Sequence, residues 1–222
     1  MEILSQGMVF NMAARINNTV KQPHAKITHL REPAKRIFVT EYIDSIMHYK
    51  ENEADEKSPV FVVTPTGAIA NRILLSGVLV SKESKMSKNG IGGRYYTLRV
   101  NDLSGTLLVY VTPYNAEAIR QITEIEEPAF VTIIGKTHIY TPEDSDKPLL
   151  SIKAESITVV DENTRNMWIL DTARQTLERI QKMRDKTAKN YNVIEEFYGN
   201  IDLTKYENAV KNMVGKLYLL VR

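Results

Sequence analysis

The segment RILLSGVLVSKE, residues 72–83, is a long run of β-favouring residues with a glycine, Gly77, near its middle. A glycine inside a strand indicates a sharp bend or a bulge. The segment AFVTIIGKTHIYT, residues 129–141, repeats this pattern around Gly135. Two long strands that each bend at a central glycine are typical of small barrels, in which a bent strand takes part in two sheets.

The remaining elements of such a barrel follow in a simple order. Residues 94–100 and 106–111 are apolar runs that predict a hairpin. Residues 115–127 predict a short helix, and residues 148–160 predict the last strand. Three strands, a short helix and two strands form the pattern of the five-stranded Greek-key barrel called the OB-fold. A parallel βαβ sheet would need a crossover helix after nearly every strand.

The N-terminal part is less regular. Residues 1–30 predict a partly mobile arm, and residues 31–161 comprise the OB-fold domain with an N-terminal extension. Within the extension, residues 36–49 fit either a strand or a helix, and residues 60–67 predict a short strand closed by a Pro/Gly turn. The polar, glycine-rich residues 84–93 predict a flexible loop of the barrel.

Helices are expected after the barrel. Residues 162–190 predict one amphipathic helix, and residues 191–200 are expected to continue it as far as Gly199. A last helix is expected over about residues 203–220, so residues 191–222 form a short helical C-terminal segment. The fold class is therefore mainly β with terminal helices.

The helix at 162–190 carries an apolar stripe with two interpretations. The stripe consists of residues spaced by three and four positions: Leu170, Ala173, Leu177 and Ile180. The opposite face is charged, with Arg174, Glu178, Arg179 and Lys182. The stripe could pack on its own barrel, but a narrow stripe on a terminal helix favours a seam with other helices. We therefore expect partner binding through this stripe, with Trp168 bracing the helix against the last strand.

Composition excludes several classes of protein. The sequence has no cysteine, which excludes disulfides, thiolate catalysis and zinc–thiolate sites. Its four histidines include no pair at i, i+4, so we expect no metal. No apolar stretch is long enough to cross a bilayer and nothing near Met1 resembles a signal peptide, so we expect a cytoplasmic protein without a membrane partner. With a net charge of +2, any nucleic-acid site must gather its basic residues on one face.

No motif of a known chemistry is present. The letters GKT at 135–137 suggest a phosphate-binding loop, but the pattern requires a glycine where Phe130 stands. The glycine-rich NGIGG at 89–93 precedes a strand, whereas a phosphate cradle opens a helix. No Ser/His/Asp set, no clustered acids and no cofactor fingerprint are found, so we expect neither an enzyme nor a cofactor.

Strand alternation places a group of aromatic and basic residues on the outer surface of the barrel. Tyrosine rings stack on bases without reading sequence, and cations follow phosphates, so this group predicts a single-strand binding groove. The alternative is that the tyrosines pad the barrel surface against the N-terminal segment or a partner. With the two residues at the strand ends included, the predicted DNA-binding set is Arg94, Tyr95, Arg99, Tyr110, Tyr114, Lys136, His138 and Tyr140.

Over roughly residues 31 to 185, the sequence resembles the archaeal replication protein A family, in particular its smaller OB-fold subunits and associated proteins. The most specific marker is NMWIL (166–170), followed by the amphipathic helix. The other matching stretches are EPAKRIFVTEY (32–42), VVTPTGAIANRILLSGVLVSKE (62–83), VNDLSGTLLVYV (100–111), PAFVTIIGKTHIY (128–140) and ESITVVDENTRNMWILDTARQTLERI (155–180).

The resemblance implies a non-catalytic subunit of a complex that coats single-stranded DNA in replication, repair and recombination. In that family, the C-terminal helix joins a three-helix bundle with helices of the large and small subunits. Some relatives add a winged helix, for which about 35 residues after the bundle helix are too few. Two other functions stay open: an architectural OB-fold that assembles partners without touching DNA, and an RNA-binding OB module.

Overall fold

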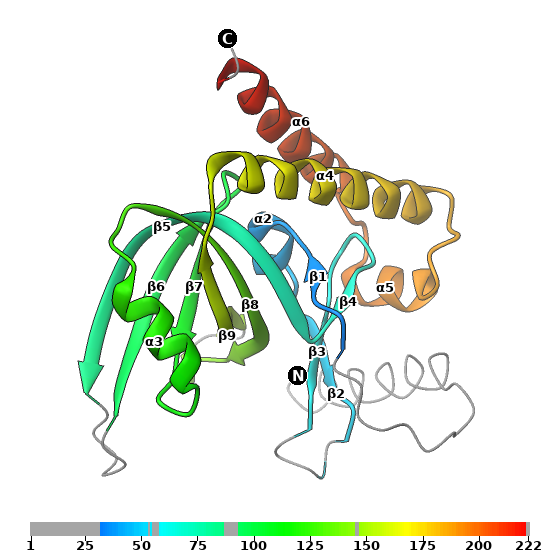
Figure 1. Cartoon of the computed structure of the whole chain (residues 1–222). Helices are drawn as coiled ribbons and strands as arrows, with labels where there is room; N and C mark the ends of the chain where they lie inside the picture. The colour runs from blue at the N-terminus through cyan, green and yellow to red at the C-terminus, as the bar shows by residue number, and fades with distance from the viewer. Residues whose placement is uncertain (1–31, 53, 55–57, 87–92, 145–146, 221–222) are drawn as a thin grey trace.

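The computed structural model describes residues 32–220, apart from residues 53, 55–57, 87–92 and 145–146 (Figure 1). The expected N-terminal arm, residues 1–30, and most of the loop expected at 84–93 therefore lie outside the described residues.

Five strands and one helix make the barrel: β5 (Arg72–Met86), β6 (Arg94–Asn101), β7 (Thr106–Val111), α3 (Ala116–Glu124), β8 (Ala129–Tyr140) and β9 (Leu149–Val159). The strands follow one another around the ring in the order β5–β6–β7–β9–β8, and β5 pairs with β8 to close it (Figure 1). The pair β7–β9 is parallel, and the other neighbouring pairs of the ring are antiparallel. This topology confirms the OB-fold that the sequence predicts.

The two glycines singled out in the sequence let neighbouring strands approach closely. Near Gly77, β5 pairs with β8 on one side and begins to pair with β6 on the other. A Cβ atom on Gly77 would lie 2.3 Å from the backbone oxygen of Asn101. A Cβ atom on Gly135 would lie 2.7 Å from the backbone oxygen of Lys153, beside a register shift between β8 and β9. Any larger residue at either point would force the strands apart.

Alternation along the strands fills the barrel with aliphatic side chains. Leu75, Leu79, Leu98, Val109 and Ile133 are each at most 1% exposed. Burial of one such side chain contributes about 1.5–3 kcal/mol to folding. The residues that alternate with them along the same strands point outward. Because burial of the core side chains fixes how the strands pair, it also fixes which side chains lie next to each other on the outer surface.

The helix α3 is anchored at both ends. Asn115 is its N-cap, as predicted, and the side-chain oxygen accepts a hydrogen bond from the Ala118 N–H at 3.2 Å. At the other end, the Lys82 ammonium donates to the backbone carbonyls of Ile122 and Ile125. A cation at this position satisfies free carbonyls and complements the negative end of the helix dipole.

The N-terminal extension contains both structures that residues 36–49 allowed. Its elements are β1 (Lys35–Arg36), α2 (Val39–Ile43), β2 (Met47–Lys50), β3 (Val60–Val63) and β4 (Ile69–Ala70). β1 adds to the barrel as a parallel neighbour of β5, whereas β2, β3 and β4 form a separate antiparallel sheet. The strand expected at 60–67 ends at Val63, and the turn contains Gly67 at φ +95°.

The turn between β6 and β7 holds α2 against the barrel. The Asp102 carboxylate is fully buried and accepts hydrogen bonds from the backbone N–H groups of Val39, Ser104 and Gly105 at 2.8, 2.9 and 3.1 Å. The Thr40 N–H donates to the Ser104 hydroxyl at 3.1 Å. Asp102 thus caps a helix that lies far from it in sequence. Burial raises the pKa of the Asp102 carboxyl, and the hydrogen bonds act in the opposite direction.

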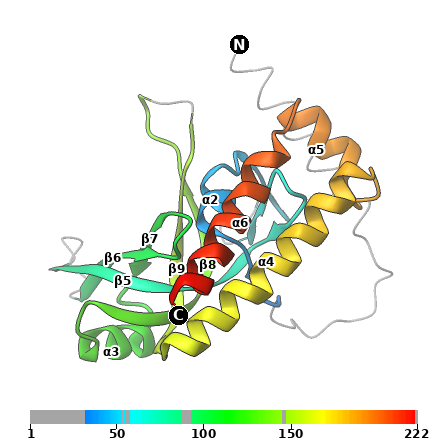
Figure 2. The ribbon, with the colours of Figure 1, turned by 90° about the horizontal axis from the view of Figure 1, so that it is seen from above.

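Three helices follow the barrel: α4 (Glu162–Arg184), α5 (Tyr191–Tyr198) and α6 (Leu203–Leu220). Seen from above, α4 and α6 run side by side (Figure 2). Val210 and Met213 of α6 share the barrel's apolar cluster with Ile169 and Ala173 of α4. In the described part of the chain, no helix is long and apolar enough to cross a membrane.

The expectation that one helix continues from residue 162 to Gly199 was wrong. The helix α4 ends at Arg184, and Lys186 adopts a left-handed φ of +58°. The N–H groups of Thr187 and Ala188 then turn back to the Lys182 carbonyl at 2.9 and 3.1 Å. This geometry terminates a helix, so α5 starts anew at residue 191. Its expected end at Gly199 is confirmed.

Candidate nucleic-acid interface

The outer surface of the barrel carries one continuous row of side chains across its strands. Thr97 of β6 pairs with Tyr110 of β7, and Tyr110 pairs with Lys153 of β9. Lys153 pairs with Lys136 of β8, and Lys136 pairs with Arg72 of β5. Directly paired residues project from the same face of a sheet, so these side chains form a row around the barrel.

The row combines the aromatic ring of Tyr110 with the positive charges of two lysines. Lys136 and Lys153 are both exposed, and neither forms an ion pair with any described residue. Arg72 differs because Glu155 neutralises it, with Nε–Oε2 and Nη2–Oε2 distances of 2.7 and 2.5 Å. The free positive charge is therefore concentrated at Lys136 and Lys153. Sequence reasoning missed Lys153, although it alternates with the buried Ile152 and would have been found by the same rule.

A second row lies one step along the strands. Arg99 pairs with Leu108, and both are exposed. His138 pairs with Ser151, whose hydroxyl lies 2.9 Å from Nδ1 of the imidazole. The rings of His138 and Tyr110 meet edge to face at 5.8 Å between centroids, which joins the two rows. Burial, reinforced by the neighbouring Lys153, lowers the pKa of His138, so the imidazole is neutral at pH 7.

The remaining predicted DNA-binding residues lie toward the two ends of this surface. Tyr140 and its partner Leu149 are each 58% exposed at the far end of the β8–β9 hairpin. Arg94 and Tyr95 lie at the opposite end, where β6 pairs with the last residues of β5. Tyr114, 82% exposed, lies beyond β7, beside the N-cap of α3. Tyr110, Lys136 and His138 are thus brought together, and the other members flank them.

The predicted partner-binding stripe is divided in the structure. Trp168, Ala173 and Ile180 are at most 5% exposed and are buried within this chain. Leu170 and Leu177 are 43% and 42% exposed. The expectation that Leu170, Ala173, Leu177 and Ile180 face a partner together is therefore corrected, because Ala173 and Ile180 are buried within this chain.

Trp168 also differs from its expected position. The indole N–H donates to the Leu74 carbonyl of β5 at 3.0 Å, and the ring meets Phe38 edge to face. The residue therefore braces α4 against the first barrel strand, whereas the last strand had been expected.

A buried polar network, which sequence reasoning did not foresee, locks α4 to the extension. Arg179, expected on the solvent face, instead donates from Nη2 to the Glu41 carboxylate of α2 at 2.9 Å. Its Nε donates to the Thr66 hydroxyl at 3.2 Å, and Thr66 donates to Glu41. Glu41 is 1% exposed, so this ion pair lies in the interior.

The site contains no evident metal ligands. Among the described residues, no three histidine, aspartate or glutamate side chains are placed to hold one ion. The chemistry available on the outer surface is stacking, hydrogen bonding and attraction of anions.

No family model matches the sequence, and no curated protein matches it. Among solved structures, one similar chain belongs to a replication protein A heterotrimer bound to single-stranded DNA. It is 14% identical, with a TM-score of 0.43 and coverage of 67% of this chain and 98% of that chain.

Two smaller proteins are also similar. The mitochondrial single-stranded DNA-binding protein Rim1 of S. cerevisiae is 17% identical, with a TM-score of 0.32 and coverage of 41% of this chain and 94% of that chain. A small single-stranded DNA-binding protein from Streptomyces coelicolor is 15% identical, with a TM-score of 0.30 and coverage of 42% and 94%. Likenesses at this level decide nothing about function.

Proposed function

We propose that this protein binds single-stranded DNA along the outer face of β6, β7, β9 and β8. The observation that carries the proposal is the row Tyr110–Lys153–Lys136, in which an aromatic ring adjoins two cations that have no carboxylate partner among the described residues. Neighbouring strands lie about 4.8 Å apart, so the row presents closely spaced positive charge across the sheet. In many OB-folds the second and third barrel strands, which correspond here to β6 and β7, form part of the oligonucleotide surface.

Each part of this surface has a distinct task. Lys136, Lys153 and Arg99 attract phosphates, and their counterion release predicts a slope of about −2 in log K against log salt for three contacts on a single strand. Tyr110 and Tyr140 offer rings to bases, and each stacked base contributes about 1–3 kcal/mol. None of these contacts reads a base edge, so binding is expected to depend weakly on sequence.

The protein acts in this proposal as a non-catalytic, cytoplasmic subunit of a complex like replication protein A, serving DNA replication, repair and recombination. The resemblance in sequence motivates this role. The exposed pair Leu170 and Leu177, seven residues apart on α4, offers a seam for a partner helix. Because α6 already lies beside α4, we expect a partner to pack on this remaining flank.

Binding is tested by fluorescence anisotropy with a labelled oligo-dT at low salt. The double variant Lys136→Ala with Lys153→Ala should weaken binding at least tenfold and flatten the salt dependence. Arg120→Ala is the control, because Arg120 is a 63% exposed cation on α3, away from the row, where it pairs with Glu117 at 2.8 Å. Equal affinity for oligo-U would favour the RNA-binding alternative. If the double variant binds like Arg120→Ala, the proposed face is wrong.

Assembly is tested separately with Leu170→Glu and Leu177→Glu combined. Both side chains are already partly exposed, so the barrel should stay folded while a partner helix is rejected, since the charges would lose water without gaining a partner. Isolation of the tagged protein from its native cell, with and without the substitutions, identifies the partners that are lost. Partners retained by the variant would contradict assembly through α4.

A further inference from the structure

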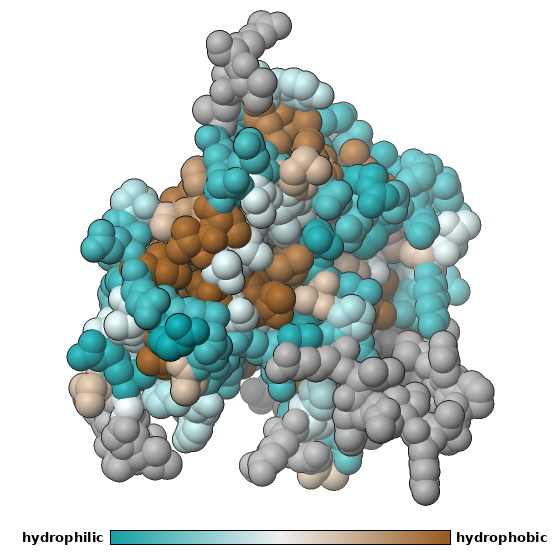
Figure 3. Space-filling model, in the orientation of Figure 1, coloured by the Kyte–Doolittle hydropathy of each residue, from teal (hydrophilic) through white to brown (hydrophobic). Residues whose placement is uncertain are grey.

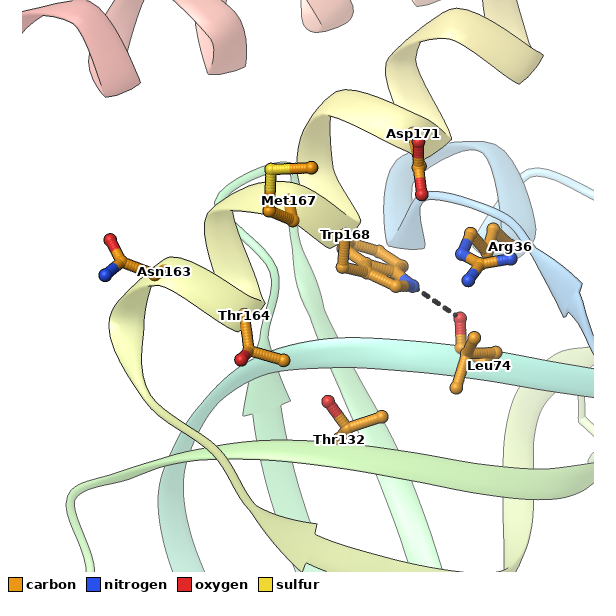
Figure 4. A pocket seen from close by; sticks show the side chains of 8 residues that line it. All are labelled: Arg36, Leu74, Thr132, Asn163, Thr164, Met167, Trp168 and Asp171. Atoms are coloured by element: carbon orange, nitrogen blue, oxygen red, sulfur yellow. Dashed lines mark hydrogen bonds between the residues drawn. The ribbon is translucent and has the colours of Figure 1, made fainter.

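A pocket of about 390 Å³ lies between the first half of α4 and the outer surface of β5 and β8, bordered by β1 (Figure 4). It shares no residue with the nucleic-acid row. The residues that matter for its chemistry are Arg36, Leu74, Thr132, Met167, Trp168 and Asp171. Its volume is within the range of sites that hold small ligands or a few side chains.

The walls of the pocket are largely apolar and held in place. Trp168 is 5% exposed, and the bond from its indole N–H to Leu74 fixes the ring (Figure 4). Met167 is 59% exposed and Val80, further along β5, is 52% exposed. On this side of the molecule, apolar surface extends over the barrel between α3 and α4 (Figure 3). The pocket therefore opens onto an apolar surface longer than the pocket itself.

The pocket is also lined by a cation, Arg36 of β1, that forms no ion pair with any described residue. The Nε atom of Arg36 is buried and has no hydrogen-bond acceptor among the described residues. Asp171 lines the same pocket but forms no ion pair with Arg36.

We propose that this pocket binds a peptide segment of a partner protein in which an acidic residue adjoins a large apolar one. The carboxylate would accept from the guanidinium of Arg36, which lines the pocket and forms no ion pair with any described residue, because hydrogen bonds between charged groups are the stronger ones. The apolar neighbour would pack between Met167 and Leu74. Nucleic acid fits less well, since the Trp168 ring is 5% exposed and, already packed, offers no free face for a base.

The proposal is tested by selecting a phage-displayed library of 12-residue peptides on the full-length protein. Enriched peptides are then synthesised with a fluorescein label as probes. We expect them to share Asp or Glu next to Leu, Phe or Trp. Arg36→Ala should weaken the binding of these probes about tenfold or more, because the variant loses one hydrogen bond to a charged group. Arg36→Lys should recover part of the affinity. Lys35→Ala is the matched control, because it removes an exposed neighbouring cation from β1.

Two further readouts separate this site from the nucleic-acid row. Arg36→Ala should leave oligo-dT affinity unchanged, and Lys136→Ala with Lys153→Ala should leave peptide affinity unchanged. If Arg36→Ala disturbs folding, Met167→Glu decides, because that side chain already faces solvent and a glutamate there should repel the acidic probe. No enrichment, enriched peptides without acidic residues, or equal losses for Lys35→Ala and Arg36→Ala would each overturn the proposal.

Discussion

Replacement of Arg179 by methionine removes the cation of the ion pair that ties α4 to α2. Glu41 would remain 1% exposed with its carboxylate facing only the Thr66 hydroxyl. Removing one partner of a buried pair costs about 3–5 kcal/mol, because the other charge stays buried alone. The Arg179 side chain is 18% exposed, so water relieves part of this cost and we expect the lower end, about 3 kcal/mol. That is a large part of a typical stability of about 5–15 kcal/mol.

Urea denaturation followed by circular dichroism measures this loss. Arg174→Met is the control on the same helix, because Arg174 pairs with Glu178 on the exposed face at 3.0 Å. Such a surface pair contributes only about 0.3–0.5 kcal/mol. Glu41→Leu combined with Arg179→Met removes both charges and should recover most of the loss. Equal losses for Arg179→Met and Arg174→Met would refute the assignment of a buried, structural ion pair.

Three further outcomes are expected. Asp102→Ala should lower the free energy of unfolding by about 1–2 kcal/mol in urea, because α2 loses its cap and the N–H groups of Val39, Ser104 and Gly105 lose their acceptor. An unchanged midpoint would show that α2 needs no cap. Oligo-dT affinity should rise as pH falls through the lowered pKa of His138, because the neutral imidazole becomes a cation beside the phosphates. The rise should come below pH 6.5 and be absent from the His138→Ala variant, and an identical rise in that variant would assign the effect elsewhere. Gly77→Ala should destabilise the barrel by more than 1 kcal/mol, since the new Cβ would lie 2.3 Å from a backbone oxygen. Gly215→Ala, in open space on α6, should instead stabilise by up to about 1 kcal/mol, and equal effects at the two sites would contradict the close approach of β5 and β6.

The barrel was predictable because its signals are local. Gly77 and Gly135 mark the places where two backbones come too close for a side chain, and period-two alternation separates core from surface. The same alternation oriented Tyr110, Lys136 and His138 correctly. The same rule orients Lys153, which alternates with the buried Ile152 on the last strand.

The features that sequence reasoning missed depend on contacts across long stretches of chain. Asp102 caps a helix 63 residues away, and Arg179 pairs with a residue 138 positions earlier. The apolar stripe on α4 shows a different limit of prediction from sequence. Apolar periodicity reveals that a helix face is buried, but the covering element is not encoded locally. Here the barrel and α6 divide the stripe, so Ile180 is core while Leu177 stays at the surface.

The most direct test of the proposed function is photocrosslinking with oligonucleotides that contain 5-bromodeoxyuridine, followed by mass spectrometry of the crosslinked peptides. A base stacked on the barrel lies against Tyr110 or Tyr140, so we expect crosslinks on β7 and β8, lost when Lys136 and Lys153 are both replaced by alanine. Tyr218, 73% exposed on α6, serves as an internal control for random collision. Crosslinks confined to Tyr218, or a pattern unchanged in the double variant, would contradict the claim that single-stranded DNA binds this face of the barrel.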